Sequence, residues 1–415
     1  MFTQKNNFQI YPVISLLAII LLTQVGCDSD DDGNNQQVAS PAAVSQPIFA
    51  KPDTGIATDG RLDLIMDYVR QQNGLPAMAA IMVHDGQIIE KSAVGQRSID
   101  SDIPVNVNDK WHIGSITKSM TSTVAALLVK NGIIRWDSAI AEVYPELVGI
   151  MRPEYQNVRL DELLSHTSGL PNNPNDINQD SFFTDQRELS VQRQELVEIV
   201  LMLSSTTTRG VYEYSNIGYI VAGAMLEKVT GSNWETLMQI HLFEPLSMLQ
   251  AGFGAPDTKG NLSQPVGHKW EAGYWEPVDP TFEEISDNPP VVGPAGTVHA
   301  SLDDMAAYIS LHLKGLRGES VDGFLDEQEF AKLYTPFPNS DYALGWVINN
   351  QSIFHNGSNT IWYAMVIINA SKNTALFVVT NSDDLEIEDS SVDKAITELV
   401  IELSTRAGAV FELSR

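Results

Sequence analysis

The stretch W-H-I-G-S-I-T-K-S-M, residues 111–120, places Ser115 one helical turn before Lys118 and directly ahead of an apolar run. A serine at the start of a helix lies among backbone N–H groups that have no partner within the helix, and at the positive end of the helix dipole. Both features favour a developing oxyanion. Lys118 falls on the same helix face, and a desolvated lysine loses its proton more readily and can serve as base to the serine. The stretch therefore predicts a nucleophile beside its base, at the entrance to a helix.

The pattern S-x-x-K also has a plain structural interpretation. Serine is a common residue at the start of helices, so Ser115 could simply cap the helix while Lys118 is solvated. The chain contains a second copy of the pattern, Ser391-Val-Asp-Lys394. That copy lies so close to the C-terminus that no further site motif can follow it, and we interpret Ser391 as a helix cap.

A second motif, Tyr214-Ser-Asn216, lies in V-Y-E-Y-S-N-I-G-Y at the entrance to a helix expected over 216–229. A phenol close to the serine can pass a proton to the leaving group. The side chain of Asn216 can hold a substrate amide or orient the lysine. The segment thus offers the proton-transfer group that a nucleophile and its base still need.

A third motif, His355-Asn-Gly357, lies in I-F-H-N-G-S just before the strongest strand of the C-terminal half. Gly357 would let a substrate backbone approach the strand edge. The N–H of Ser358 could then be a second oxyanion donor beside that of Ser115. Each short motif has other matches in the chain, but only this set occurs in the order S-x-x-K, Y-x-N, H-x-G with long intervening segments.

Hydrophobic periodicity predicts strands at both ends of the chain and helices between them. Two alternating runs joined across Asp85-Gly86 predict a β-hairpin near the N-terminus. The economical arrangement is α/β of the α+β type: one antiparallel sheet from both chain ends, flanked by helices, with a mainly helical lobe inserted at about 115–313. The expected helices are 115–131, 191–204, 216–229, 233–241, 302–314 and 391–403, with Ser301 capping the fifth, and the expected C-terminal strands are 344–348, 361–368 and 375–380.

Composition excludes one class of partner. The formal net charge is −28, and a protein that binds nucleic acid needs lysine and arginine to meet the phosphates. The acidic surface is expected to keep the protein soluble. We expect no nucleic-acid partner, no metal site and no cofactor. The sequence contains no G-x-S-x-G elbow, no H-E-x-x-H and no Walker loop, so an α/β-hydrolase, a zinc protease and a nucleotide enzyme have no support.

The N-terminus has the features of an export signal. A weakly positive start precedes a short apolar run, and Gln24-Val-Gly-Cys27 follows, with Cys27 the only cysteine of the chain. This segment resembles the lipobox of bacterial lipoproteins, in which the cysteine is lipidated after cleavage; an unmodified signal or a buried thiol is the alternative. We expect a lipoprotein signal peptide at 1–26, a disordered acidic tether at 27–54, the folded domain at 55–405 and a tail at 406–415.

With these motifs, the sequence resembles the serine β-lactamase and penicillin-binding protein superfamily, in its class C β-lactamase-related branch, over about residues 55–405. The resemblance implies a β-lactamase/transpeptidase-like fold. It implies Ser115 as the acylated nucleophile, Lys118 as its base and Tyr214 as the proton-transfer residue. Asn216 and the strand from His355 to Ser358, which includes Asn356 and Gly357, would bind substrate. Further segments that carry the resemblance are L-L-S-H-T-S-G-L-P (163–171), L-F-E-P-L-S-M (242–248), P-A-G-T-V-H-A-S-L-D-D-M (294–305) and V-V-T-N (378–381).

One departure from the family pattern bears on the substrate. True class C β-lactamases carry Lys-Thr-Gly where this chain has His355-Asn-Gly, and a histidine is largely neutral at pH 7. His-x-Gly occurs in the family among DD-peptidases, D-aminopeptidases and esterase-like relatives, so efficient antibiotic hydrolysis is not expected. Three other prominent residues have structural interpretations: His166 at a turn, and Trp346 and Trp362 as strand aromatics of the core.

The expected function is an exported serine hydrolase that forms an acyl-enzyme on Ser115, with D-alanyl-D-alanine carboxypeptidase-like activity. A carboxylesterase of the same fold is the first alternative, and a class C-type β-lactamase the second. A catalytically idle lipoprotein that only binds penicillin or peptidoglycan is the rival from another class. The expected substrates are thus a D-Ala-D-Ala peptide, an ester or a β-lactam. We expect a monomer, anchored to a bacterial membrane through Cys27, with its domain in the periplasm or outside the cell.

Overall fold

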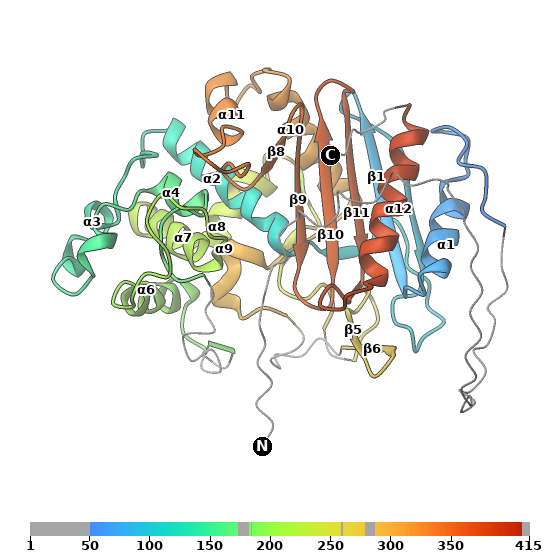
Figure 1. Cartoon of the computed structure of the whole chain (residues 1–415), viewed down its shortest axis with the longest axis horizontal. Coiled ribbons are helices and arrows are strands. Elements are labelled where there is room, and N and C mark those ends of the chain that lie inside the picture. The colour runs from blue at the N-terminus through green and yellow to red at the C-terminus, as the bar shows by residue number, and fades with distance from the viewer. Residues whose placement is uncertain (1–49, 173–181, 184, 259, 279–286, 409–415) are drawn as a thin grey trace, which may run out of the picture.

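A six-stranded antiparallel sheet joins the two ends of the chain (Figure 1). The computed structural model describes residues 50–172, 182–183, 185–258, 260–278 and 287–408. Strands from the N-terminal part lie beside strands from the C-terminal part, in the order β2-β1-β11-β10-β9-β8. This confirms the predicted fold class. The strands are β1 (Ala77–His84), β2 (Gln87–Gly95), β8 (Val347–Asn349), β9 (Ser352–Ser358), β10 (Tyr363–Asn369) and β11 (Thr374–Thr380).

The predicted hairpin is present between β1 and β2. Asp85 and Gly86 both have positive φ, 49° and 71°, which a two-residue turn of the kind favoured between twisted strands requires. The strand expected over 344–348 begins only at Val347. Leu344 and Trp346 are buried in the loop that precedes β8. The motif His355-Asn-Gly357 lies within β9, directly ahead of β10, which is the strong strand expected over 361–368.

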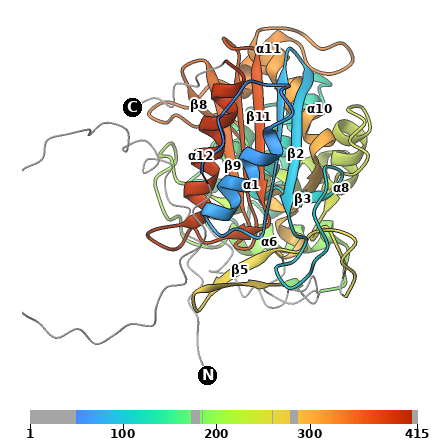
Figure 2. The ribbon, with the colours of Figure 1, turned by 90° about the vertical axis from the view of Figure 1, so that its right-hand side faces the viewer.

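Helices cover both faces of the sheet (Figures 1 and 2). The side chains of the strands alternate between the two faces. Helices α1 (Leu62–Gln72) and α12 (Ser391–Arg406) cover one face, which receives Tyr363, Met365 and Ile367 of β10. The alternate residues of β10 join the larger core shared with α10 (Leu302–Leu316) and the helical lobe. The helical lobe thus meets the sheet at the face opposite α1 and α12.

The helical lobe follows the predicted helices with shifts of a few residues. The helix expected from residue 115 starts with a 3-10 turn, η2 (Gly114–Ile116), and continues as α2 (Thr117–Lys130). Ser301 caps α10 as expected, because its hydroxyl accepts the N–H of Asp304. The other elements are α3 (Ile140–Val143), η3 (Pro145–Leu147), η4 (Pro153–Tyr155), α4 (Leu160–Leu164), α6 (Leu189–Val200), α7 (Asn216–Thr230), α8 (Trp234–Met238), a π turn η6 (Gln239–Phe243), η7 (Pro290–Val292), α9 (Gly293–Gly296) and α11 (Glu327–Leu333), with two small sheets, β3 (Lys110–His112)-β7 (Val298–Ser301)-β4 (Gly252–Phe253) and β12 (Ser382–Asp383)-β5 (His268–Glu271)-β6 (Tyr274–Pro277).

The ends of the domain differ slightly from the expected boundaries. Lys51 and Thr54, in the segment expected to be a tether, pair with Glu402 of α12. That helix extends through Arg406, whose buried guanidinium pairs with Asp59. The start of α12 corrects one expectation, since Ser390 rather than Ser391 is its cap. The expected signal peptide and Cys27 lie outside the described residues, and no described helix is long and apolar enough to span a bilayer.

Candidate active site

Ser115 lies where the 3-10 turn η2 touches the C-terminal end of β9, and its side chain is partly exposed. Two glycines make this close approach possible. A Cβ on Gly114 (φ +52°) would lie 2.5 Å from the N atom of Ser358, and one on Gly357 would lie 2.0 Å from the carbonyl oxygen of Ile113. Because neither residue has a side chain, the backbone N–H of Ser115 and that of Ser358 come close together, as an oxyanion hole requires.

Lys118 is fully buried one turn into the helix, and its Nζ lies 3.0 Å from Ser115 Oγ. The Nζ also donates a hydrogen bond of 2.7 Å to the carbonyl oxygen of Ala295 in α9. Burial lowers the pKa of Lys118 well below its ordinary value, because the charged form is desolvated. The arrangement favours a neutral amine that can accept the proton of Ser115.

Tyr214 lies directly against this pair. The Lys118 Nζ is 4.9 Å from the centre of the Tyr214 ring. Burial raises the pKa of Tyr214 well above its ordinary value, and the neighbouring Ser115 only partly opposes that rise. The phenol hydroxyl is buried with no hydrogen-bond partner of good geometry among the described residues. It is thus a protonated donor that remains available to a substrate.

His166 supports the loop that carries Tyr214. Its Nδ1 accepts the N–H of Ser215 at 3.0 Å, and its ring lies 4.2 Å from that of Tyr214. Its φ of +61° places it in a turn, and burial lowers its pKa well below the ordinary value. His166 therefore lies at a turn, as the sequence suggested, although its buried Nε2 has no hydrogen-bond partner among the described residues. Trp346 and Trp362 are likewise buried in the core.

His355 is buried on β9 and faces the helical lobe. Its Nδ1 is 2.5 Å from the carbonyl oxygen of Asn356, which can only accept, so Nδ1 carries the ring proton. Its Nε2 then accepts the hydroxyl of Tyr342 at 2.9 Å. Burial lowers the pKa of His355 to about 3. Both ring nitrogens are engaged and the ring is uncharged.

The remaining predicted residues are not all brought to Ser115. Alternation along β9 turns the side chains of Asn356 and Ser358 to the opposite face of the sheet, beside Tyr363. There the hydroxyl of Ser358 donates to the Asp383 carboxylate, and burial raises the pKa of Asp383 to about 7. Only the backbone of Ser358 faces the nucleophile. Asn216 begins α7, and its N–H donates to the carbonyl oxygen of Asn172 at 3.0 Å.

Sequence reasoning missed several groups of the site. The carbonyl of Ala295 lies in P-A-G-T, a segment that carried the resemblance, so its position could have suggested a role. Tyr342, which contacts His355, lies in none of the motifs, and neither does Asp383, which accepts the hydroxyl of Ser358 on the face of the sheet away from Ser115. Their roles depend on contacts between segments that are distant in the sequence.

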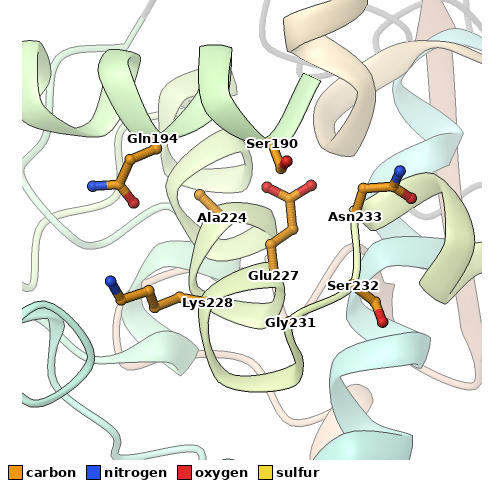
Figure 3. Close-up of a pocket in the computed structure, with 8 residues that line it drawn as sticks. All are labelled: Ser190, Gln194, Ala224, Glu227, Lys228, Gly231, Ser232 and Asn233. Atoms are coloured by element: carbon orange, nitrogen blue, oxygen red, sulfur yellow. The ribbon is translucent and has the colours of Figure 1, made fainter. Parts of the chain in front are cut away.

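A shallow pocket of about 280 Å³ lies elsewhere, on the outer side of the lobe between α6, α7 and the start of α8 (Figure 3). None of the motif residues lines it. Its polar lining includes Glu227, which belongs to a buried ion cluster with Arg193. Among the described residues, no group of three or more histidine, cysteine, aspartate or glutamate side chains is arranged to hold a metal ion.

Several known proteins are similar to this chain. Protein flp of Staphylococcus aureus strain MW2 is 21% identical over 341 residues, covering 77% of this chain and 62% of that protein. The chain thus spans less than two thirds of the length of that relative. The putative penicillin-binding protein PbpX of Bacillus subtilis strain 168 is 22% identical over 82% of this chain and 81% of that protein.

Solved structures agree on the fold. The octameric penicillin-binding protein homologue from Pyrococcus abyssi superposes with a TM-score of 0.68 at 21% identity, over 86% of this chain and 79% of that one. SurE superposes with a TM-score of 0.64 at 22% identity, over 84% and 74%. The Beta-lactamase family profile matches residues 62–400. With Lys118 and Tyr214 beside Ser115 and this match over most of its length, the chain belongs to the Beta-lactamase family, within the superfamily of serine β-lactamases and penicillin-binding proteins.

Proposed function

We propose that this protein is a serine hydrolase that forms an acyl-enzyme on Ser115, with D-alanyl-D-alanine carboxypeptidase-like activity. The observation that carries the proposal is the buried Nζ of Lys118, 3.0 Å from Ser115 Oγ, with a pKa lowered by burial. The nearest hydrogen-bond acceptor of that amine besides Ser115 is a neutral carbonyl, so nothing there stabilises the ammonium form as a carboxylate would.

The geometry supports two successive transfers. The Lys118 amine takes the proton of Ser115 while Oγ attacks the substrate carbonyl carbon, and the N–H groups of Ser115 and Ser358 receive the oxyanion. The hydroxyl of Tyr214 gives its proton to the leaving group as that bond breaks, and the Lys118 ammonium restores the proton to Tyr214. Water then attacks the acyl carbonyl by the same route, which releases the acid and regenerates Ser115.

Two comparisons support a D-amino-acid peptide as the acyl donor. PbpX carries the name of a penicillin-binding protein, and SurE has been solved with D-Leu, at a TM-score of 0.64 and 19% identity to this chain. His-x-Gly, which this chain has at His355, occurs among DD-peptidases of the superfamily. A peptide ending in D-Ala-D-Ala fits these features.

A carboxylesterase is the second candidate, and the state of His355 favours it. The uncharged ring, with both nitrogens engaged, offers no cation to a substrate carboxylate. An ester with a neutral leaving group does not need one. The same feature counts against substrates that carry a carboxylate near the scissile bond, which include both β-lactam antibiotics and a D-Ala-D-Ala peptide, so the peptide needs another group to hold its terminal carboxylate. A class C-type β-lactamase, which has no further support of the kind given for the peptide, is third.

The substrate class is tested by one comparison of rates. The purified protein is given a D-Ala-D-Ala peptide, a p-nitrophenyl ester and a cephalosporin side by side, with Ser115→Ala as blank. Release of D-Ala above the blank, with the highest kcat/KM of the three, supports the carboxypeptidase. Turnover of the ester alone assigns a carboxylesterase, and preferred turnover of the cephalosporin assigns a β-lactamase.

An idle binding lipoprotein is separated from these enzymes by covalent labelling. A fluorophosphonate or fluorescent penicillin should label the wild type and leave Ser115→Ala unlabelled. Equal labelling of both proteins would refute the nucleophile. Labelling of Ser115 with no turnover of any substrate would favour the binding protein.

We also propose that the protein is exported and anchored to a bacterial membrane through a lipidated Cys27. The support is the sequence Gln24-Val-Gly-Cys27 after a short apolar run. A monomer remains our proposal for the assembly state, to be checked by light scattering, because the octameric state belongs to the P. abyssi homologue.

A further inference from the structure

One carboxylate outside the motifs lies between the two backbone segments that supply the oxyanion donors. Asp287 has a side chain only 12% exposed, and its Oδ1 is 3.0 Å from Nε2 of His112. The same oxygen accepts a hydrogen bond of 3.1 Å from the side-chain amide of Asn359. Oδ1 also accepts the backbone N–H of the adjacent Asn288 at 2.7 Å. Its two partners from elsewhere in the fold lie far apart in the chain: His112 is the last residue of β3, and Asn359 directly follows β9.

His112 connects Asp287 to the backbone next to Ser115. Nδ1 of the fully buried His112 accepts the backbone N–H of Gly114 at 3.1 Å, so the ring proton of the neutral form lies on Nε2, toward Asp287. The Nε2–H group of His112 is not aligned well enough with Asp287 Oδ1 for a good hydrogen bond, so the contact between the two is chiefly electrostatic. A carboxylate at Nε2 fixes the tautomer and the ring orientation, and thereby the N–H of Gly114, the residue before Ser115.

Asn359 connects Asp287 to the backbone next to Ser358, the second oxyanion donor. Asn359 is 4% exposed and directly follows Ser358, and its Oδ1 also accepts the N–H of Ile361 at 3.4 Å. A single carboxylate oxygen is thus linked to the residue before one oxyanion donor and to the residue after the other. Gly114 and Gly357, where these segments touch, have no side chains to set the separation.

We infer that Asp287 is a positioning residue of the oxyanion hole, which sets the distance between the N–H groups of Ser115 and Ser358 through His112 and Asn359. The inference rests on the proposed acyl-enzyme function. A transition-state oxyanion needs both donors within about 2.7–3.1 Å, so a small separation of the two segments weakens both hydrogen bonds together. The other carboxylate oxygen, Oδ2, is buried without a hydrogen-bond partner among the described residues, so Oδ1 makes the contacts that this role needs.

The test is Asp287→Ala assayed on a p-nitrophenyl ester. We expect kcat to fall about 10- to 100-fold, with KM changed less than about 3-fold, because the lost interaction acts in the transition state. The affinity for a boronic acid that mimics the tetrahedral intermediate should fall by the same factor as kcat/KM. Asp287→Asn, whose amide oxygen can still accept from both partners, should recover most of the activity. Asp303→Ala is the matched control, since Asp303 is exposed and pairs with Lys91.

Two outcomes would overturn the inference. One is a folded Asp287→Ala with the kcat and boronate affinity of the wild type. The other is a KM effect alone, which would make Asp287 a ground-state binding residue. If Asp287→Ala does not fold, Asn359→Ala decides: a kcat loss with unchanged melting temperature supports the role, and unchanged kcat refutes it. Failure of the proposed function is recognised separately, as equal labelling of the wild type and Ser115→Ala.

Discussion

Lys118 is a cation-forming side chain in a place where a cation is costly. Its Nζ is buried against Ser115, Tyr214 and a backbone carbonyl, and a buried ammonium without a counter-ion is strongly disfavoured. The amine can therefore be neutral at a pH where a solvated lysine is charged. This is the property that distinguishes it from Lys394 in the second S-x-x-K, which is half exposed and paired with Asp389.

Replacing Lys118 with arginine should abolish acylation, because a guanidinium stays protonated and cannot accept the Ser115 proton. We expect the p-nitrophenol burst rate to fall on the order of 10²- to 10⁴-fold. In the wild type, the acylation rate should fall as the pH falls through the lowered pKa of Lys118, since protonation removes the base. Lys394→Arg is the matched control. A burst of normal rate in folded Lys118→Arg would exclude the lysine as base.

Asp383 predicts a pH dependence of stability. Its carboxyl has a pKa of about 7 in the folded protein because it is buried, whereas an aspartate in an unfolded chain titrates near 4. The folded state therefore holds this proton more tightly, so its contribution to stability is present at low pH and is lost as the pH rises from about 4 to about 7. The difference in unfolding free energy between wild type and Asp383→Asn should fall over that window by on the order of 4 kcal/mol, since each of the roughly three pKa units corresponds to about 1.4 kcal/mol.

Urea denaturation at intervals between pH 4 and 8 measures this difference. The exposed Asp137→Asn is the control, and its difference from wild type should not show the same fall. Asp384 and Glu386 lie close enough to raise the Asp383 pKa further, so they are kept intact in all variants. A difference that is flat with pH would mean that Asp383 does not hold its proton in the folded protein.

At the scale of elements, the site depends on contact between η2 and β9, which are far apart in the chain. The contact is backbone on backbone, and only glycine permits it at both positions. Alternation along β9 then divides its roles, since His355 faces the lobe while the side chains of Asn356 and Ser358 face α1 and α12. The side chains of Asn356 and Ser358 thus lie on the layer of α1 and α12, whereas the backbone of Ser358 faces Ser115 in the other layer.

Gly357→Ala should therefore damage activity directly. The added Cβ would lie 2.0 Å from the carbonyl oxygen of Ile113 and 2.7 Å from N of Ser115, so one of the two segments has to move. A displacement of about 1 Å can cost on the order of 10²-fold in rate, and we expect a loss of that size in kcat/KM on the ester. The control is Gly149→Ala, where a Cβ meets nothing within 4 Å. Wild-type kcat/KM in folded Gly357→Ala would refute the predicted clash.

At the scale of the whole molecule, the two chain ends build one sheet and the middle of the chain builds the lobe beside it (Figure 1). Lys51 and Thr54 contact α12, so a tether from Cys27 would enter the domain at the face covered by α1 and α12. Ser115 belongs to the opposite layer. A membrane anchor on this chain would therefore attach on the side of the sheet away from the catalytic groups.

The anchor is tested with Cys27→Ser expressed in a bacterial host. The wild type should fractionate with membranes and be released by detergent, because two or more acyl chains hold a lipoprotein stably. The variant should lose the lipid and leave the membrane fraction, with unchanged ester hydrolysis per molecule. Equal membrane association of both proteins would refute lipidation at Cys27.

The sequence by itself determined the features that are encoded locally or by chain order. Asp85-Gly86 identified the hairpin, because a tight turn needs positive φ, and Ser301 identified the start of α10, because its hydroxyl accepts a nearby N–H. The order of the three motifs distinguished Ser115 from Ser391. Even the cap at 390 rather than 391 was an error of only one residue.

Only the tertiary structure decided the charges and the contacts of the site. The buried Nζ of Lys118 donates to the carbonyl of Ala295, and Nε2 of His355 accepts from Tyr342, neither of which the three motifs contain. No local signal showed that Ser358 turns its hydroxyl to Asp383, since that requires the register of β9 in the sheet. A pKa is set by whatever surrounds a group in space, so these properties appear only when distant segments meet.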